Sequence, residues 1–413
     1  MEAEERVRTT LKYLKAKFKQ YYETTPLHLP PRFGRREYGF IFFDGGYIQR
    51  HLAFSSEADL YSFLRSRLPS HIYHSAAYYE NPGAPTMGEK GWMGADLIFD
   101  LDADHIPGSI GMGYKGMLEA VKDQVIRLID EFLEQDMGFK SSEMTISFSG
   151  ARGYHVHVRH QKILILKSHE RREIVDYITG TGLDIDFIAR SEPFELKTYK
   201  ERSRTLKRLR IPTPSEPGWR GRASRGILRW VDQMSGLPEE EALVEIRKLE
   251  GVGQARSAKI YDTLFKRLGR EQALERVRSG VLDFLPRAGG LSIAAQGVNL
   301  MKGVTDEPVT SDIKRLIRVI GSLHGKTGLM VVPLTRDQLE DFDPLTDAIP
   351  PIYSHETIRV HIQKGIETDM MGETFNLKRG KNRVPEYLAI FLMCRGMATL
   401  VSGTHDEESE ETV

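Results

Sequence analysis

Hydrophobic positions in the first 184 residues alternate between helical and strand-like spacing. In residues 5–22 apolar side chains recur every three or four positions, which predicts a helix that the Pro-rich residues 26–31 end. Residues 56–68 and 117–135 are predicted to form two further helices. Residues 81–94, rich in Gly and Pro, are predicted to form a loop. Short apolar runs between turn residues predict strands at residues 37–43, 47–54, 72–79, 96–102, 144–148 and 153–158.

The pattern changes over residues 185–285, where helical segments carry many charges, and strand-like sequence resumes beyond them. We therefore predict one α/β core of the α+β kind, made of residues 1–184 and 286–400. Residues 185–285 are predicted to form a mainly helical insertion into that core. Residues 401–413 are acidic and contain no aromatic residue, so they are predicted to form a disordered tail.

Composition narrows the class of protein without identifying it. The chain has 413 residues, 40% of them hydrophobic, which is enough for two or three domains with sizeable cores. It contains no run of 18 or more apolar residues, so a membrane span is not expected. The first residues lack the features of a signal peptide, and we expect an intracellular, cytoplasmic protein. The single cysteine, Cys394, excludes an internal disulfide and a thiolate-rich zinc or iron–sulfur site.

Charge is balanced overall and uneven along the chain. Lys plus Arg and Asp plus Glu each total 58, yet residues 196–230 hold eleven basic residues and two acidic ones. This segment fits either a nucleic-acid contact or a solvated helix face followed by a loop. Residues 249–260 are close to a helix-hairpin-helix signature, whose G-x-G backbone meets DNA phosphates, and they fit a simple helix–helix turn equally well. The basic residues include Lys197, Lys200, Arg202, Arg204, Lys207, Arg208, Arg210, Arg220, Arg222 and Arg225.

Two carboxylates stand at the end of the predicted strand 96–102. Asp100 and Asp102 are two positions apart, so on a strand their side chains share one face. Two unpaired carboxylates side by side are costly, and a divalent cation with a preference for oxygen ligands, Mg²⁺ or Mn²⁺, relieves that cost. The alternative is that these residues cap a loop or pair with arginines. Asp104 is a possible additional ligand, although it is expected to lie beyond the strand.

A glycine-rich turn precedes the predicted strand 153–158. Residues 149–155 read Ser-Gly-Ala-Arg-Gly-Tyr-His, and such a turn lets backbone N–H groups approach an anion. Arg152 adds a forked donor that suits phosphate, and His155 is the histidine nearest the turn. His155 and His157 share a strand face, and both could instead be core residues. A zinc site with His160 is the weaker alternative, because no cysteine or nearby carboxylate completes it.

A third polar segment covers residues 306–328. A helix is expected from about Thr310, and a Gly-rich turn follows it. Asp306 is a candidate third carboxylate, whereas Asp312 is expected to cap the helix or to lie in its first turn. The segment also carries a second cationic set, made of Arg315, Arg318, His324 and Lys326.

Taken together and in this order, the three segments resemble motifs of the small, catalytic subunit of archaeal and eukaryotic-type DNA primase. Asp100-Leu-Asp102 is similar to its first acidic motif, and residues 149–155 to its S-G-x-x-G-x-H motif. Residues 306–328 are similar to its third motif, and residues 36–54 match as well. The resemblance covers most of residues 30–180 and 300–335.

The resemblance implies a mixed-sheet α/β (α+β) core and a set of roles. Asp100, Asp102 and Asp306 would hold two divalent ions, Mg²⁺ or Mn²⁺, and would be the catalytic carboxylates. The partners implied are a primase large subunit in a heterodimer, a single-stranded DNA template and nucleoside triphosphates. Residues 103–115 lack the family's usual Cys/His zinc knuckle, so no structural zinc is predicted. The residues implied to bind the nucleotide phosphates are Arg50, Ser149, Arg152, His155, Arg318 and His324.

Three other functions stay open at this point. A related repair-type primase-polymerase would share all of these motifs. A metal-dependent glycosyltransferase would use the D-x-D pair alone and leave the other two segments unexplained. A non-catalytic nucleic-acid-binding subunit would tolerate replacement of either carboxylate. The sequence does not distinguish RNA from DNA primers.

Overall fold

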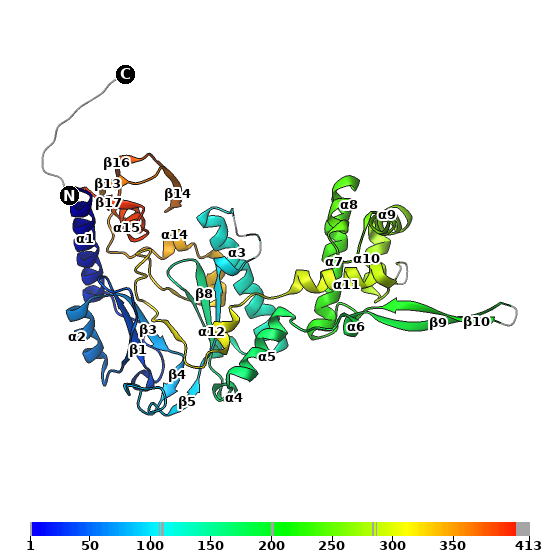
Figure 1. Ribbon diagram of the computed structural model, residues 1–413, viewed down its shortest axis with the longest axis horizontal. Helices are drawn as coiled ribbons and strands as arrows, with labels where there is room; N and C mark the ends of the chain where they lie inside the picture. The colour runs from blue at the N-terminus through cyan, green and yellow to red at the C-terminus, as the bar shows by residue number, and fades with distance from the viewer. Residues whose placement is uncertain are drawn as a thin grey trace, which may run out of the picture. The chain divides into compact units, whose positions relative to one another are not determined.

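The computed structural model describes residues 2–106, 108, 111–199, 202–282, 285 and 287–401, with the backbone alone for residues 2, 194–199 and 202–207. The chain divides into two compact units (Figure 1). The first comprises Met1–Glu134, Gly138–Val175 and Val304–Val413; the second comprises Gln135–Met137 and Asp176–Gly303. The predicted insertion, residues 185–285, lies inside the second unit. The predicted tail lies outside the described residues, apart from Val401.

A four-stranded antiparallel sheet lies at the N-terminal side of the first unit. Its order is β11 (Leu316–Arg318), β3 (Pro69–Ser75), β1 (Tyr38–Phe42) and β2 (Gln49–Leu52). Helices α1 (Glu2–Thr24) and α2 (Glu57–Arg67) pack against it, because the apolar stripe of each helix faces the sheet. The resulting core contains Phe18, Tyr21, Tyr22, Tyr38, Phe40, Leu60, Leu64 and Ile72.

A second antiparallel sheet carries the two predicted motif strands. Its order is β12 (Pro333–Leu334), β7 (Met144–Phe148), β8 (Gly153–Val158) and β6 (Leu97–Asp102). All six residues of β8 are buried, as expected of a central strand. Helix α3 (Tyr114–Arg127) packs on β6 and β8 and continues as a π-helical stretch, η3 (Leu128–Asp136).

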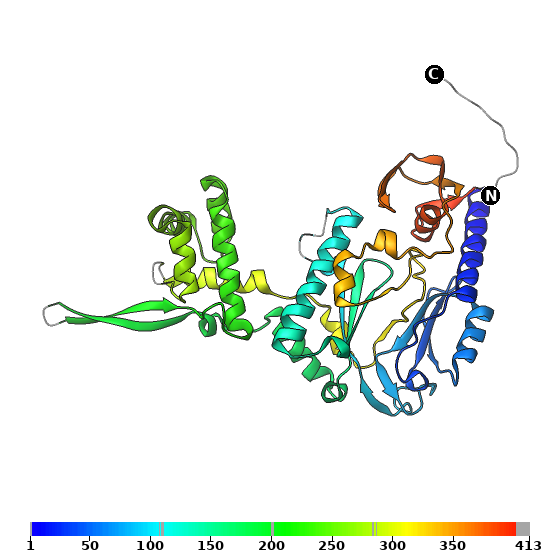
Figure 2. The ribbon, with the colours of Figure 1, turned by 180° about the vertical axis from the view of Figure 1, so that it is seen from behind.

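The C-terminal residues form a small sheet beside the N-terminal helix. Strands β16 (Gly380–Pro385), β13 (Thr357–Ile362) and β17 (Ala398–Leu400) pair in that order, and helix α15 (Glu386–Cys394) packs against all three. The Leu400 N–H donates to Thr10 Oγ1 of α1 at 2.8 Å, which joins the two ends of the described chain (Figure 2). The hairpin of β14 (Ile366–Met370) and β15 (Glu373–Leu377) connects β13 to β16.

The remaining elements of the first unit are short, apart from the three-turn helix α5, which runs into the second unit. They are η1 (Phe33–Arg35), β4 (Ala77–Tyr79), β5 (Trp92–Ala95), η2 (Ala103–His105), η4 (Ser141–Glu143), α4 (Gln161–Leu164), α5 (Ser168–Thr179), α12 (Glu307–Ser311), α13 (Arg336–Asp341) and α14 (Pro344–Asp347). Within the described part of the chain, no helix has the length and hydrophobicity that crossing a membrane requires.

The second unit is built around two closely packed helices, α7 (Gly218–Ser235) and α11 (Arg287–Met301). A Cβ atom on Gly226 would lie 2.0 Å from the Gly297 carbonyl oxygen, so only glycine permits this approach. Arg222 is fully buried, and its Nη1 donates to Asp136 at 2.6 Å. The other elements are α6 (Ile185–Ile188), the hairpin of β9 (Arg190–Tyr199) and β10 (Arg202–Arg210), α8 (Glu239–Arg247), α9 (Gln254–Tyr261), η5 (Asp262–Leu268) and α10 (Arg270–Arg278).

The predicted α+β fold class is confirmed, with helices packed on separate sheets. Every strand pairing in the described residues is antiparallel, whereas the resemblance implied mixed sheets. Two local expectations also need correction. Residues 92–94, expected in a loop, belong to β5, which pairs with β4. Residues 190–210, expected in a mainly helical insertion, form the long β9–β10 hairpin.

The helix expected from about Thr310 is wrong. Helix α12 already ends at Ser311, and Asp312 follows its last turn with an extended backbone. The Asp312 carboxylate accepts the N–H of Lys314 at 2.8 Å, which turns the chain out of the helix. Leu316 and its neighbours then pair with β3 as strand β11, because this sheet edge satisfies their backbone groups.

Candidate active site

Strand pairing places the two predicted carboxylates at the C-terminal end of β6, in the second sheet. Asp100 lies opposite His155, and Asp102 lies opposite Gly153 at the start of β8. The Asp100 side chain is 21% exposed, and its Oδ1 is 3.6 Å from His155 Nε2. Leu97, Ile98, Phe99 and Leu101 of β6 are buried, whereas Asp100 and Asp102 are partly exposed, so the carboxylates emerge together near the end of the strand.

Asp102 also makes the contacts that its alternative interpretation expected. Its Oδ1 accepts the backbone N–H of Asp104 at 3.2 Å and lies 3.8 Å from Arg152 Nη2. These contacts leave 34% of its side chain exposed. Capping of η2 and a role as metal ligand are therefore compatible on this side chain.

Asp306, the candidate third carboxylate, lies next to the first. Its backbone N–H donates to the Asp100 carbonyl oxygen at 2.9 Å, and Thr305 Oγ1 lies 3.4 Å from the same oxygen. Asp306 directly precedes α12, yet its carboxylate makes no capping hydrogen bond to that helix. Two segments about 200 residues apart in sequence thus bring a third negative charge to the end of β6.

The electrostatics at Asp100 reflect this crowding of carboxylates. Burial, together with the nearby charges of Asp102 and Asp306, raises the pKa of Asp100 to about 6, while Arg315 and Arg318 oppose the shift. A bound cation would relieve this repulsion, and carboxylate oxygens are the ligands that Mg²⁺ and Mn²⁺ prefer. The described residues nevertheless contain no ready-made group of three or more His, Cys, Asp or Glu side chains that could hold a metal ion.

The glycine-rich turn between β7 and β8 has a conformation that its sequence requires. Gly150 has φ +82°, and a Cβ atom there would lie 2.8 Å from the Cβ atom of His324. The carbonyl oxygen of Gly150 accepts a hydrogen bond from Thr327 Oγ1 at 2.5 Å. The turn is therefore packed directly against the loop that carries His324.

Gly150→Ala is expected to destabilise the fold by about 1–3 kcal/mol, because alanine disfavours the positive φ and has no room beside His324. Gly138→Ala is a matched control. Gly138 has φ +73° with open space around it, so this variant measures the cost of the positive φ alone. Urea unfolding of both variants measures the difference. Equal losses would contradict the packing of this turn against the His324 loop.

One cationic residue near the turn, Arg318, is held by a histidine and a tyrosine. Arg318 Nη1 is 2.8 Å from His71 Nδ1 and donates to Tyr73 Oη at 2.9 Å. Burial, with Arg318 nearby, lowers the pKa of His71 and of His155 to about 3, and the pKa of His324 is also well below its usual value. These imidazoles are therefore uncharged at neutral pH and leave the positive charge to the arginines.

These side chains line one cavity of about 720 Å³ in the first unit. Arg152 lies at its rim, where Nη2 donates to Asp104 at 2.6 Å. The lining residues that sequence reasoning missed include His71, Tyr73, Tyr114 and Arg395. The predicted site residues that line the cavity are Asp100, Asp102, Ser149, Arg152, His155, Arg318 and His324.

Two predicted site residues do not line this cavity. Asp306 is not among the lining residues, but its backbone N–H is bonded to the carbonyl oxygen of Asp100, which lines the cavity. Arg50 instead donates to the buried carboxylate of Glu37, from Nε at 2.9 Å and from Nη2 at 3.2 Å. Burial raises the pKa of Glu37, but Arg50, the N–H of His51 and the charge of Lys90 outweigh this effect, so the net pKa is lowered. The structure thus assigns Arg50 a clear packing role beside β1.

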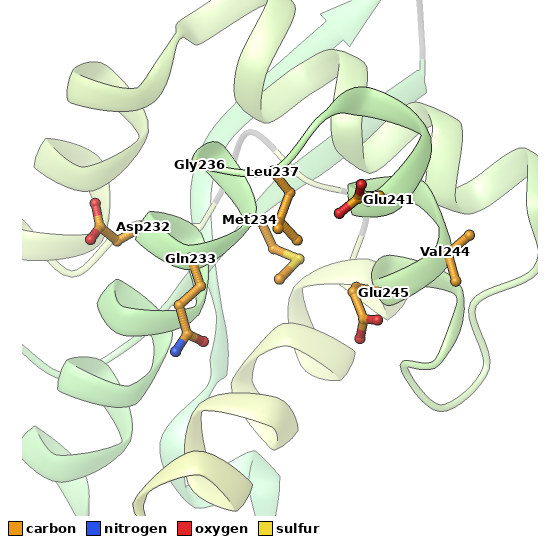
Figure 3. A pocket seen from close by; sticks show the side chains of 8 residues that line it. All are labelled: Asp232, Gln233, Met234, Gly236, Leu237, Glu241, Val244 and Glu245. Carbon is orange, nitrogen blue, oxygen red and sulfur yellow. The ribbon is translucent and has the colours of Figure 1, made fainter. Parts of the chain in front are cut away.

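The second unit has a groove of different chemistry, with a volume of about 680 Å³ (Figure 3). Met234 and Leu237 lie at its centre, and Glu241 and Glu245 of α8 line its other side. No lysine or arginine lines it, so it does not suit a phosphate. The complete lining is Asp232, Gln233, Met234, Gly236, Leu237, Glu241, Val244 and Glu245.

The basic segment at residues 196–230 is only partly described. Lys200 lies outside the described residues, as do the side chains of Lys197, Arg202, Arg204 and Lys207. Among the others, Arg210, Arg220 and Arg222 form ion pairs with Glu192, Glu216 and Asp136. Part of this charge is therefore used within the second unit itself.

Residues 249–260 do connect two helices, as both of their interpretations predicted. Gly251 has φ +69° in the turn between α8 and α9, and Gly253 is the residue that precedes α9. The Arg256 guanidinium donates to the Gly251 carbonyl oxygen and so braces the turn. This geometry fits a helix-hairpin-helix contact with DNA and a plain helix–helix turn alike.

Comparison with known proteins agrees with this site. A sequence profile of the family described as DNA primase small subunit matches residues 99–336, more than half of the 413-residue chain. A DNA primase small subunit PriS from Methanothrix thermoacetophila is 43% identical over 398 residues, covering 94% of this chain and 98% of its own. The protein of the same name from Methanocella arvoryzae is 45% identical over 404 residues, with 94% and 98% covered. With the carboxylates, the glycine turn and the cationic loop gathered around one cavity, this chain belongs to the DNA primase small subunit family.

Proposed function

We propose that this chain is the catalytic subunit of a DNA primase, which makes short primers on single-stranded DNA by two-metal nucleotidyl transfer. The observation that carries the proposal is the single cavity in which Asp100 and Asp102 face Ser149, Arg152 and Arg318. Acidic ligands for cations and basic ligands for phosphates are the two halves of a nucleotidyl-transfer site. The raised pKa of Asp100 supports a cation at the acidic half.

The carboxylates would hold the cations. Asp100 and Asp102 present oxygen atoms from one strand face, and Asp306 supplies a third carboxylate beside them. When bound, two Mg²⁺ or Mn²⁺ ions would lower the pKa of the attacking 3′-hydroxyl and neutralise the departing pyrophosphate. The prediction that the protein contains no structural zinc stays a prediction.

The basic and neutral polar residues of the cavity would bind the triphosphate. The guanidinium groups of Arg152 and Arg318 offer forked donors, and Ser149 and the neutral imidazoles of His155 and His324 offer single ones. Arg318 is held in place by His71 and Tyr73, so less side-chain entropy is lost when it binds a phosphate. Arg50 pairs with Glu37 and does not line the cavity, so the structure gives no support to its implied contact with the nucleotide.

The partners remain proposals. The relatives are named small subunits, and we propose a heterodimer with a primase large subunit that acts on the chromosome in the cytoplasm. A single-stranded template and nucleoside triphosphates are the proposed substrates. The choice between ribonucleotides and deoxyribonucleotides is left to experiment.

Metal affinity is expected to fall in mild acid. Because the pKa of Asp100 is raised to about 6, protons compete with the cation for this carboxylate below that pH. The Mn²⁺ concentration that half-saturates the protein should then rise about tenfold for each pH unit below 6, and should be nearly constant above pH 7. Direct Mn²⁺ titration followed by electron paramagnetic resonance measures it. A half-saturating concentration unchanged from pH 7.5 to pH 5 would contradict the assignment of Asp100 as a ligand.

Unprimed synthesis tests the proposed function. Single-stranded DNA is incubated with labelled nucleotides and Mg²⁺ or Mn²⁺ without primer, and template-dependent product from the wild type is expected. Extension of a supplied primer alone would favour a repair-type polymerase or a requirement for the large subunit, which adding that subunit resolves. Tight DNA binding without any product, with the large subunit present, would favour a non-catalytic subunit. Sugar transfer from a nucleotide sugar would favour the glycosyltransferase alternative.

A further inference from the structure

The C-terminal residues, which no predicted motif covers, contribute a cationic side chain to the cavity. Cys394, the last residue of α15, and the two residues that follow it, Arg395 and Gly396, line the cavity. Arg395 is exposed, and no carboxylate of the described residues forms an ion pair with it. Arg152, by contrast, is paired with Asp104 at 2.6 Å. Arg395 is therefore an uncompensated positive charge at the cavity.

Two aromatic rings support the Arg395 guanidinium. Its central carbon lies 4.6 Å from the ring centre of Tyr114 and 5.1 Å from that of Phe391. The two rings themselves pack edge to face, with centres 5.7 Å apart. An arginine that stacks on aromatic faces keeps its N–H edge available for hydrogen bonds. Its orientation is fixed before a ligand arrives.

Tyr114 also connects Arg395 to the glycine-rich turn. Its hydroxyl donates to the Ala151 carbonyl oxygen at 2.5 Å, one residue before Arg152. Burial raises the pKa of Tyr114 to about 12, so this hydroxyl keeps its proton at neutral pH. One side chain thus links the start of α3, the glycine turn and the end of α15.

We infer that Arg395, seated on Tyr114 and Phe391, is a further phosphate-binding residue of this cavity. Its forked donors suit the oxygens of a phosphate, which either a nucleoside triphosphate or a nucleic-acid strand supplies. The inference rests on the proposed function, because it takes the ligand of the cavity to be a nucleotide or a strand. It adds the C-terminal part of the chain to the site.

Arg395→Gln is compared with Arg379→Gln, an exposed arginine between β15 and β16 that does not line the cavity. Binding of fluorescent single-stranded DNA and of a labelled, non-hydrolysable nucleoside triphosphate is measured without divalent metal over a range of salt concentrations. Arg395→Gln is expected to lower the affinity for one of these ligands about tenfold or more. If the strand is the ligand, the slope of log affinity against log salt also falls by about 0.7. If both ligands bind as tightly as to the wild type, the inference is overturned.

The aromatic support is tested separately. Tyr114→Phe keeps the ring and removes only the bond to Ala151, so it should weaken ligand binding less than Tyr114→Leu does. Tyr114→Leu removes the ring and should weaken binding as Arg395→Gln does. The double variant Arg395→Gln/Tyr114→Leu should be no weaker than Arg395→Gln alone, provided that circular dichroism shows all four proteins folded. Additive losses would overturn the role of the ring.

These measurements need no catalysis, so they separate the two claims. If the wild type synthesises nothing and Arg395→Gln binds a ligand more weakly than the wild type, the proposed function is overturned and the phosphate site is supported. If the wild type synthesises primers and Arg395→Gln binds both ligands as tightly as the wild type does, the proposed function is supported and the phosphate site is overturned.

Discussion

Asp102→Asn is expected to lower the rate of nucleotide addition by about 1000-fold or more. The asparagine keeps an oxygen that accepts the N–H of Asp104, so the local cap of η2 survives. It removes the negative charge that would bind a cation, and loss of a metal ligand costs several kcal/mol of transition-state stabilisation. Single-turnover extension of a primer–template by wild type and variant measures the effect.

The control for this variant is Asp44→Asn, which changes a carboxylate that is 70% exposed, pairs with Lys15 and does not line the cavity. It should leave the rate unchanged, and both variants should show the circular dichroism of the wild type. An Asp102→Asn variant with nearly normal activity would mean that Asp102 only caps the loop. It would favour a non-catalytic nucleic-acid-binding subunit.

Asp96→Ala is expected to lower the free energy of unfolding by about 3–5 kcal/mol. Asp96 is fully buried and directly precedes β6. Its carboxylate accepts hydrogen bonds from Arg36 at 2.8 Å and from Arg159 at 3.1 Å. Arg36 is also fully buried, so the variant leaves its positive charge uncompensated in the interior. Urea unfolding at pH 7 measures the loss.

The pH dependence of this ion pair has a definite sign. Arg36 and Arg159 lower the pKa of Asp96 despite its burial, so the folded protein favours the charged carboxylate. Its contribution to stability is present above the usual pKa of an aspartate and is lost as the pH falls through the lowered value. The difference in stability between wild type and Asp96→Ala should therefore shrink in strong acid. A loss below about 1 kcal/mol at pH 7 would show that Asp96 behaves like an exposed pair.

Short-range pattern was sufficient to predict the strands that carry the first two motifs. In β6 the apolar run ends in two charges at alternate positions, and in β8 the histidines alternate with buried apolar residues. Such alternation depends on backbone geometry alone. It therefore predicted both that Asp100 and Asp102 share a face and that His155 lies nearest the glycine turn.

Long-range pairing explains what the sequence could not predict. Strand β11 forms because residues 316–318 complete the edge of β3, some 240 residues earlier in the chain, although their local pattern favoured a helix. The β9–β10 hairpin was missed because its charged sequence lacks the alternation of a half-buried strand.

The cavity residues that were missed have the same origin. His71, Tyr114 and Arg395 come from β3, the start of α3 and the end of α15, and none of them belongs to a local motif. Strand β3 contains two buried histidines, His71 and His74, so the presence of a histidine in this strand does not single out His71. Tertiary packing brings such residues together, so a single sequence does not identify them.

The central claim is that Asp100, Asp102 and Asp306 hold two catalytic cations in this cavity. Crystals of the protein soaked with Mn²⁺ and a non-hydrolysable nucleoside triphosphate test it, because anomalous diffraction locates each Mn²⁺ ion directly. The account predicts two Mn²⁺ peaks beside these carboxylates, with the triphosphate against Arg152 and Arg318. A nucleotide bound there with no peak beside Asp100 and Asp102 would contradict it.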